Sequence, residues 1–262
     1  CPLLLLAMPD TPTPRWTPDG GITIYGRKPA LEALLDPTLK IHCLHLATSN
    51  RPAKIIAQIT EIANKRRIEI RHHDRLGLSR ISKNSKQDQG VALDIICNDF
   101  CSITDFLASP VERVTLLALD GVTNPQNVGM IIRSAVAAGV DGLLYPAKGV
   151  AALGPLVIKA SAGTVFRAPI IHCDELDHAL PQLKRAGFGI AMLEAGATQS
   201  LFYYQPFAPT VFVFGSESDG VSQRTRELTD TRVSIPMLNG VESLNVAVTA
   251  ALVAFHLSST KS

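Results

Sequence analysis

Residues 233–249 read Val-Ser-Ile-Pro-Met-Leu-Asn-Gly-Val-Glu-Ser-Leu-Asn-Val-Ala-Val-Thr. A short apolar strand that ends at Pro236 and Met237 precedes a polar turn, and Ser243 is expected to begin a long helix rich in Ala, Val and Leu. The free N–H groups and the positive dipole end of a helix start favour an anionic or electron-rich ligand. Ser243 and Asn245 therefore mark a candidate binding site, and the alternative is that Ser243 is an ordinary N-cap of a buried helix.

The chain around this stretch alternates between strand and helix patterns. The expected strands are 114–119, 142–145, 188–193, 210–215 and 233–236, and the expected helices are 127–138, 155–161, 174–186, 222–228 and 243–257. Several of these strands are continuous apolar runs, as in a parallel sheet that is buried on both faces. We therefore predict a doubly wound α/β domain with a parallel sheet over residues 111–262. Ligands bind such sheets outside the carboxyl ends of the strands.

A second polar strand end follows the run 115–119. The sequence Asn-Pro-Gln-Asn-Val-Gly over residues 124–129 leads into the helix that carries Arg133. Asn127 is expected at the helix start, with Arg133 about two turns further on. The alternative is that the two asparagines are turn and cap residues and that Arg133 is a surface cation.

A third strand end, residues 211–220, runs from bulky apolar residues into Gly-Ser-Glu-Ser-Asp-Gly. Gly215 would let a flat ligand approach the backbone closely, and Glu217 lies between the two glycines. The segment is one residue too long for the hydrolase G-x-S-x-G elbow, and no convincing His/Asp partners accompany it, so hydrolysis is disfavoured.

Residues 21–98 are predicted to form a smaller α/β unit, preceded by a flexible proline-rich tail over 1–20 and followed by a linker over 99–110 with a helical turn at 100–107. Its expected strands are 22–25, 41–47, 68–71 and 91–97, its helices are 28–35 and 54–65, and 79–90 is expected to be a basic, polar loop. Ten Lys or Arg residues lie between Arg51 and Lys86, against three acids. Such a basic excess is typical of a surface that binds a polyanion, and the alternative is a solvated helix face.

Composition narrows the class of protein. The 262 residues are 46% hydrophobic and only 5% aromatic, which suits a well-packed α/β protein. The five cysteines, at 1, 43, 97, 101 and 173, lack zinc-type pairing, and we interpret them as reduced thiols in a cytoplasmic protein. No apolar run approaches the roughly 18 residues that span a bilayer. No metal-ligand cluster is apparent in the sequence.

The three strand ends together resemble the SPOUT-class RNA methyltransferases of the SpoU/TrmH family, which methylate ribose 2′-hydroxyls with S-adenosylmethionine. Residues 124–133 are similar to the family's first motif, 215–220 to its second, and 235–237 with 243–246 to its third. Residues 25–91 resemble the family's small substrate-binding domain, which is related to ribosomal RNA-binding proteins. One departure is Ser218, where the family usually has glycine.

The resemblance implies a C-terminal trefoil knot that holds S-adenosylmethionine, and a homodimer in which each active site is completed by the partner subunit. It further implies structured RNA as substrate, most closely a guanosine of 23S rRNA, with no metal and no membrane. Glu217 would orient Arg133 or contact the ribose, and Arg133 would position a phosphate or stabilise the developing alkoxide. The resemblance implies a catalytic set of Asn127, Arg133, Glu217, Ser243 and Asn245, and cofactor contacts around Gly215, Ile235 and Leu244. It also strengthens the expectation that the basic segment binds RNA, through Lys65, Arg66, Arg67, Lys83 and Lys86.

Other functions fit less well. A nicotinamide dehydrogenase would need G-x-G-x-x-G after a first strand, and a P-loop NTPase would need G-x-x-x-x-G-K-[ST]; neither is present. Two alternatives stay open: a tRNA ribose 2′-O-methyltransferase, and a non-catalytic RNA-binding or ribosome-assembly protein. The second leaves the polar strand ends after residue 111 unexplained.

Overall fold

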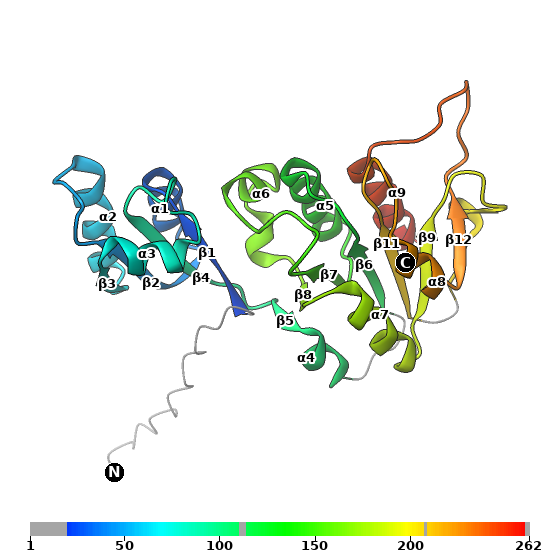
Figure 1. Ribbon diagram of the computed structural model, residues 1–262, viewed down its shortest axis with the longest axis horizontal. Coiled ribbons are helices and arrows are strands. Elements are labelled where there is room, and N and C mark those ends of the chain that lie inside the picture. Colours follow the sequence, from blue (N-terminus) through cyan, green and yellow to red (C-terminus); the bar gives the residue numbers. More distant parts are fainter. Residues whose placement is uncertain (1–19, 110–113, 207–208, 260–262) are drawn as a thin grey trace, which may run out of the picture.

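The computed structural model describes residues 20–109, 114–206 and 209–259 (Figure 1). Most of the predicted flexible tail lies outside these residues. Within them, the chain forms two β-sheets with helices packed against both. No helix of the described part is long and apolar enough to cross a membrane. The cysteines of the described part are free thiols at positions 43, 97, 101 and 173.

The first sheet has four strands in the order β1-β4-β2-β3. The strands are β1 (Gly21–Tyr25), β2 (Lys40–Ala47), β3 (Glu69–His73) and β4 (Val91–Ile96), and the helices are α1 (Arg27–Leu35), α2 (Lys54–Lys65) and α3 (Arg75–Ser82). Strands β2 and β3 are parallel, whereas β4 is antiparallel to β1 and β2. Apolar side chains of α1 and α2, such as Leu34 and Ile59, share a core with Leu44 and Leu93 of the sheet. The predicted strands and helices of this unit are confirmed to within a few residues.

Helix α3 corrects the prediction of a polar loop over 79–90, because its last turn reaches Ser82. Gly77, Ser79 and Ser82 are weak helix formers, so the pattern does not indicate a helix. Two interactions compensate: the Asp74 carboxylate accepts a hydrogen bond from the Gly77 N–H at 2.7 Å, and Leu78 is buried against the sheet. Capping and burial together stabilise this short helix.

The second sheet has eight strands in the order β10-β12-β9-β11-β6-β7-β8-β5. They are β5 (Cys101–Ser102), β6 (Thr115–Leu119), β7 (Gly142–Pro146), β8 (Ile170–Cys173), β9 (Gly189–Leu193), β10 (Gln199–Ser200), β11 (Thr210–Phe214) and β12 (Thr231–Ser234). Every neighbouring pair is parallel, which confirms the predicted parallel sheet. Strands β5, β8 and β10 were not predicted, and β5 joins the sheet edge from within the segment predicted as a linker.

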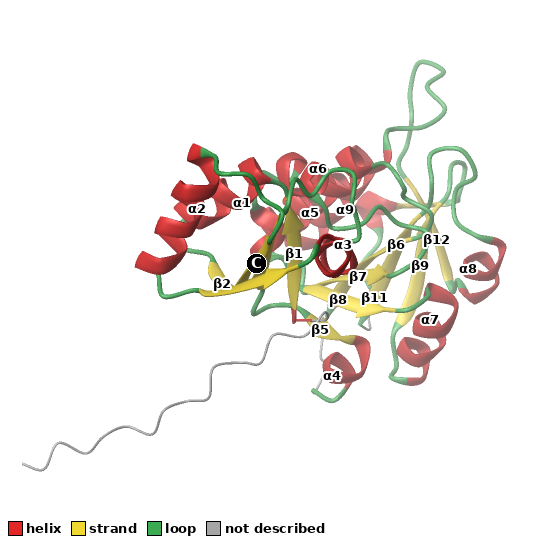
Figure 2. Ribbon diagram, turned by 60° about the vertical axis from the view of Figure 1, so that its left-hand side comes forward, coloured by secondary structure: helices red, strands yellow, loops and turns green. Residues whose placement is uncertain are grey.

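Helices cover both faces of this sheet. They are α4 (Ile103–Leu107), α5 (Pro125–Ala137), α6 (Pro155–Ala160), α7 (Leu176–Arg185), α8 (Gln223–Leu228) and α9 (Val246–Ser259), with short 3-10 turns at Thr164–Arg167 and Leu201–Tyr203. Figures 1 and 2 show α5, α6 and α9 on one side and α4, α7 and α8 on the other. Alternate residues of β6 point to opposite faces of the sheet. Leu117 packs in the core with α5 and α9, whereas Leu116 packs in the core with α7. The sheet is therefore doubly wound, as predicted.

The stretch at 233–249 differs from the prediction at both ends. Strand β12 ends at Ser234 rather than at Pro236 and Met237, and α9 begins at Val246 rather than at Ser243. The Asn245 side-chain oxygen accepts a hydrogen bond from the Ala247 N–H at 2.9 Å, so Asn245 caps the helix. The residues between β12 and α9 form a long loop that projects beyond the sheet in Figure 1.

Candidate functional site

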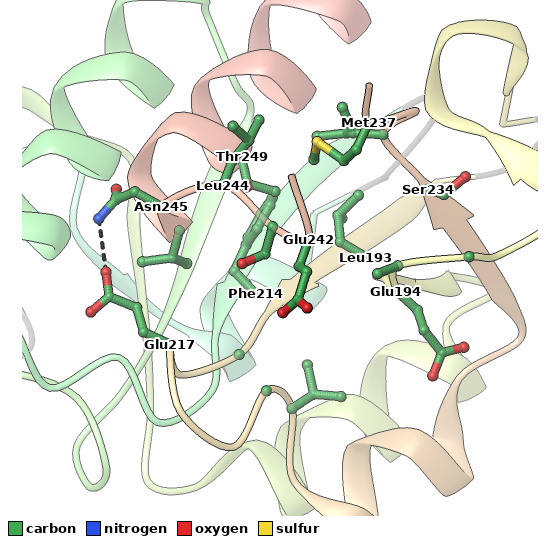
Figure 3. A pocket seen from close by; sticks show the side chains of 18 of the residues that line it. Leu193, Glu194, Phe214, Glu217, Ser234, Met237, Glu242, Leu244, Asn245 and Thr249 are labelled. Carbon is green, nitrogen blue, oxygen red and sulfur yellow. Dashed lines mark hydrogen bonds between the residues drawn. The ribbon is translucent and has the colours of Figure 1, made fainter. Parts of the chain in front are cut away.

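A cavity of about 900 Å³ lies at the carboxyl ends of β9, β11 and β12 and beside the start of α9 (Figure 3). This is the edge of a parallel sheet at which ligands bind. Its walls combine apolar side chains, including Leu193, Phe214 and Met237, with the polar backbone of the loops that follow the strands. All three residues predicted to contact a cofactor line this cavity, namely Gly215, Ile235 and Leu244.

Three polar side chains, here called the amide–carboxylate cluster, meet at one side of the cavity: Asn127, Glu217 and Asn245. The Asn127 and Asn245 side-chain amides both donate to Glu217 Oε1, at 2.6 and 2.7 Å. Asn245 Nδ2 also lies 3.2 Å from Asn127 Oδ1. Figure 3 shows Glu217 and Asn245 facing each other from the loop after β11 and the start of α9. The cluster ties together the three strand ends that the sequence singled out.

Local structure fixes the two asparagines in this arrangement. Helix α5 begins at Pro125, two residues earlier than predicted, because the Asn124 side chain caps it by accepting from the Gln126 N–H at 2.9 Å. Asn127 therefore lies inside the first turn and is only 6% exposed. The cap at Ala247 engages the Asn245 side-chain oxygen, so its nitrogen is left to donate to the cluster.

Gly215 is required for a reason other than the expected approach of a ligand. A Cβ atom at this position would lie 2.0 Å from the Gly220 carbonyl carbon, because the loop folds back over it. Ser216 and Gly220 exchange two backbone hydrogen bonds, of 2.9 and 3.1 Å, that close this loop. Ser218 has no positive φ, so serine in place of the family's usual glycine causes no backbone strain.

A fourth strand end, the loop after β9, also lines the cavity and was missed in the sequence. Glu194 is held there between Arg226 at 2.9 Å and Arg232 at 3.2 Å, so its charge is balanced within the wall. The available signal was Gly196, a positive-φ glycine two residues after Glu194, which marks a tight turn after an apolar strand.

The structure does not bring all predicted catalytic residues together. Ser243 lines the cavity, although it does not begin the helix. Arg133 is exposed on α5, does not line the cavity, and makes no hydrogen bond or ion pair with the described residues. Glu217 bonds to the two amides instead of orienting Arg133.

The five predicted RNA-binding cations also differ in their surroundings. Lys65 pairs with Glu61 at 2.6 Å, and Lys86 lines a cavity in the first sheet's unit. Arg67 and Lys83 are exposed residues with positive φ. Arg66 is half-buried, and its guanidinium donates to three backbone carbonyls of residues 34, 36 and 39, at 2.6–3.0 Å. These bonds connect the guanidinium to the loop after α1.

Among the described residues, no group of three or more His, Cys, Asp or Glu side chains is placed to hold a metal ion.

Comparison with known protein families gives two matches. Residues 115–255 match the SpoU rRNA Methylase family, and residues 23–96 match the family described as RNA 2′-O ribose methyltransferase substrate binding. The first match contains the whole amide–carboxylate cluster. The second covers the four-stranded sheet with its helices.

Individual relatives agree with these matches. An uncharacterized tRNA/rRNA methyltransferase from Mycolicibacterium vanbaalenii is 33% identical over 233 residues, which cover 88% of this chain and 74% of the relative. The SpoU methyltransferase AviRb from Streptomyces viridochromogenes, solved in complex with AdoMet, has the same fold with a TM-score of 0.64 at 21% identity, covering 92% of this chain and 91% of that one. The AdoMet-bound rRNA methyltransferase from Sinorhizobium meliloti has a TM-score of 0.60 at 21% identity, covering 92% and 87%.

Proposed function

The chain belongs to the SpoU rRNA methylase family, and on that premise we propose that it transfers a methyl group from S-adenosylmethionine to a ribose 2′-hydroxyl of structured RNA. The observation that carries the proposal is the amide–carboxylate cluster beside the cavity at the carboxyl ends of β9, β11 and β12. The substrate-binding family match over residues 23–96 supports RNA as the substrate.

The cavity fits the proposed cofactor. Its volume of about 900 Å³ suits a ligand of that size. Leu193, Ile235 and Leu244 offer apolar surface for a purine ring, while the surrounding backbone offers donors and acceptors. Both oxygens of Glu194 are engaged by arginines, so the charge of this carboxylate is balanced within the wall. When bound, S-adenosylmethionine supplies an electrophilic methyl group on a sulfonium.

The amide–carboxylate cluster would position the ribose. Glu217 Oε1 is occupied by the two asparagine amides, whereas Oε2 accepts no hydrogen bond from the described residues. Oε2 can accept one from a ribose hydroxyl, which orients the hydroxyl oxygen toward its reaction partner and polarises its O–H bond. Because Asn127 and Asn245 hold the carboxylate in place, the hydroxyl would meet a preorganised acceptor.

We further propose a homodimer in which Arg133 serves the partner's site. An exposed apolar face supports this: Val248 and Phe255 of α9 are 43% and 52% exposed, and Met130 of the adjoining α5 is 43% exposed. A cavity of about 330 Å³ on this face is lined by α9 residues and Phe202. Apolar patches of this kind mark association surfaces, and a two-fold axis would bring a single patch onto itself. Arg133 lies one turn from Met130 and would border this contact.

Sedimentation tests the dimer. Phe255→Asp places a charge at the centre of the face and is expected to give a monomer, whereas Phe202→Ser at its edge is expected to weaken association less. A wild-type chain that sediments as a monomer at micromolar concentration would contradict the homodimer. The knotted chain path implied by the family stays a prediction.

We propose a guanosine of 23S rRNA as the target, since the order of the two matched regions resembles enzymes of that specificity. The test is transfer of labelled methyl groups from S-adenosylmethionine to RNA from a strain that lacks this protein, with rRNA and tRNA separated afterwards. Label in 23S rRNA supports the proposal, whereas label confined to tRNA would show that the protein is a tRNA methyltransferase. Absence of label in RNA that the protein binds would favour the non-catalytic alternative.

A further inference from the structure

A second cavity, of about 520 Å³, lies in the unit of the four-stranded sheet. Its walls come from the start of α1, the loop between β2 and α2, helix α3, and the turn before β4. These elements lie at the blue and cyan end of the chain in Figure 1. We call it the cationic pocket, because four of its lining residues are Arg27, Arg51, Arg75 and Lys86.

The charges of the cationic pocket are unbalanced. The one acidic residue in its wall, Asp88, is 8% exposed and has both oxygens engaged, by the Ser82 hydroxyl at 2.9 Å and the Gly90 N–H at 3.0 Å. In the described part of the chain, Arg51, Arg75 and Lys86 have no hydrogen-bonding or ion-pair partner. Four positive charges against one negative charge leave the pocket with a net positive charge, and a bound polyanion would relieve the repulsion among the cations.

The wall of the pocket is held rigidly. Arg27 Nε donates to the Gln89 carbonyl at 3.1 Å, and Asn50 Nδ2 donates to the Gly90 carbonyl at 2.8 Å. Gly90 has φ +79°, and a Cβ there would lie 2.1 Å from Asn50 Oδ1, so only glycine allows this packing. The rim that carries Arg27 is thus ordered without a ligand, which lowers the entropy cost of binding one.

The remaining lining residues indicate which part of a nucleic acid would bind. The lining includes Ser49, Asn50 and Ser85 but no aromatic side chain. Stacking on aromatic rings is a common way in which a protein holds an unpaired base, and this lining offers no such ring. Guanidinium groups match phosphate oxygens in a bidentate manner, and hydroxyl and amide groups can bond to ribose oxygens.

From these observations we propose that the cationic pocket binds the sugar–phosphate backbone of the substrate RNA, with Arg51 and Arg75 contacting neighbouring phosphates. This proposal rests on the proposed function, of which it specifies the substrate contact. In this proposal RNA binds at the pocket rather than at Lys65, Arg66 and Arg67 near the end of α2. Lys65 is paired with Glu61, and the Arg66 guanidinium donates to backbone carbonyls.

Salt-dependent RNA binding tests the proposal with two double variants that each remove two positive charges. Arg51→Gln with Arg75→Gln alters the pocket, and Lys65→Gln with Arg67→Gln alters exposed residues at the end of α2. Each phosphate contact contributes about 0.7–0.9 to the slope of log K against log salt. The pocket variant is therefore expected to lower the slope by about 1.4–1.8 for two lost contacts. The α2 variant is expected to keep the wild-type slope.

Cofactor affinity, measured by calorimetry, should be unchanged in both variants and serves as a check on folding. An unchanged slope in the pocket variant would overturn the proposal, as would an equal loss of slope in the two variants. Adenosine monophosphate tests a small-nucleotide site: micromolar binding that the pocket variant abolishes, without any change in the RNA slope, would also overturn it. If RNA binds through the pocket but is never methylated, the proposed function is refuted, whereas the proposal that the pocket binds RNA is retained.

Discussion

Glu217 is the acceptor that the buried Asn127 amide and the exposed Asn245 amide share, and its removal gives the sharpest test of the amide–carboxylate cluster. In Glu217→Ala, Asn127 Nδ2 loses its one acceptor among the described residues, whereas Asn245 Nδ2 keeps Asn127 Oδ1 at 3.2 Å. An unsatisfied buried donor costs about 1–3 kcal/mol. Asn127 is 6% exposed, so we expect a loss of about 1–2 kcal/mol in the free energy of unfolding.

For a chain of this size, a loss of about 1–2 kcal/mol corresponds to a fall in Tm of roughly 2–8 °C. Glu217→Gln keeps an oxygen acceptor and should lose less stability, since only the charge of the two hydrogen bonds is removed. Both variants should lose methyl transfer by at least about tenfold, because the ribose acceptor is gone or neutral.

Thermal unfolding and single-turnover methyl transfer measure these two effects. Asp219→Asn is a matched control, because it removes an exposed carboxylate from the same loop whose side-chain bonds involve only Ser218. It should keep the wild-type Tm and activity. If Glu217→Ala unfolds at the wild-type temperature and retains transfer, the cluster neither joins the three strand ends nor positions the substrate.

Three further variants address other parts of the molecule. Arg133→Ala should abolish methyl transfer while leaving cofactor affinity within about threefold, and full activity would remove Arg133 from the site. Gly90→Ala should lower the free energy of unfolding by about 1–3 kcal/mol, because φ is +79° and the new methyl group meets Asn50; a wild-type denaturation midpoint would contradict this. Burial, with the neighbouring His45 ring, lowers the pKa of His73. In the unfolded chain His73 has its ordinary pKa of about 6.5, so near that pH the unfolded chain binds more protons than the folded protein. The free energy of unfolding should therefore fall as the pH drops from 7.5 to 5.5. His73→Gln should reduce that fall by at most about 1.4 kcal/mol per pH unit. Denaturant titrations measure it, and an equal loss of unfolding free energy in the variant and the wild type would show that His73 does not contribute.

The parallel sheet could be predicted because its central strands consist almost entirely of apolar residues, as strands buried on both faces do. After an initial threonine, residues 116–119 and 211–214 are apolar throughout, and both strands are buried between two helical layers. Strand β8 was missed because its run is short and follows a proline, and β10 has only two residues. A strand of that length is defined by its partners rather than by any local pattern.

The candidate site was predictable in its residue types but not in its exact bonding. Polar residues at three strand ends identified Asn127, Glu217 and Asn245, since a parallel sheet brings such ends to one edge. The sequence predicted that Ser243 begins the last helix, whereas in the folded loop Asn245 caps α9. Arg66 looked like part of a basic surface, yet its carbonyl acceptors lie about 30 residues away in the chain. Contacts at that separation leave no local signal.

The position of the transferred methyl group tests the central claim most directly. RNA labelled by the protein with S-adenosylmethionine is hydrolysed completely in alkali, which requires a free 2′-hydroxyl next to each phosphodiester that breaks. We predict label in an alkali-resistant dinucleotide, because a methylated 2′-oxygen cannot attack its neighbouring phosphate. Label recovered only in mononucleotides would place the methyl group on a base and contradict ribose methylation at this site.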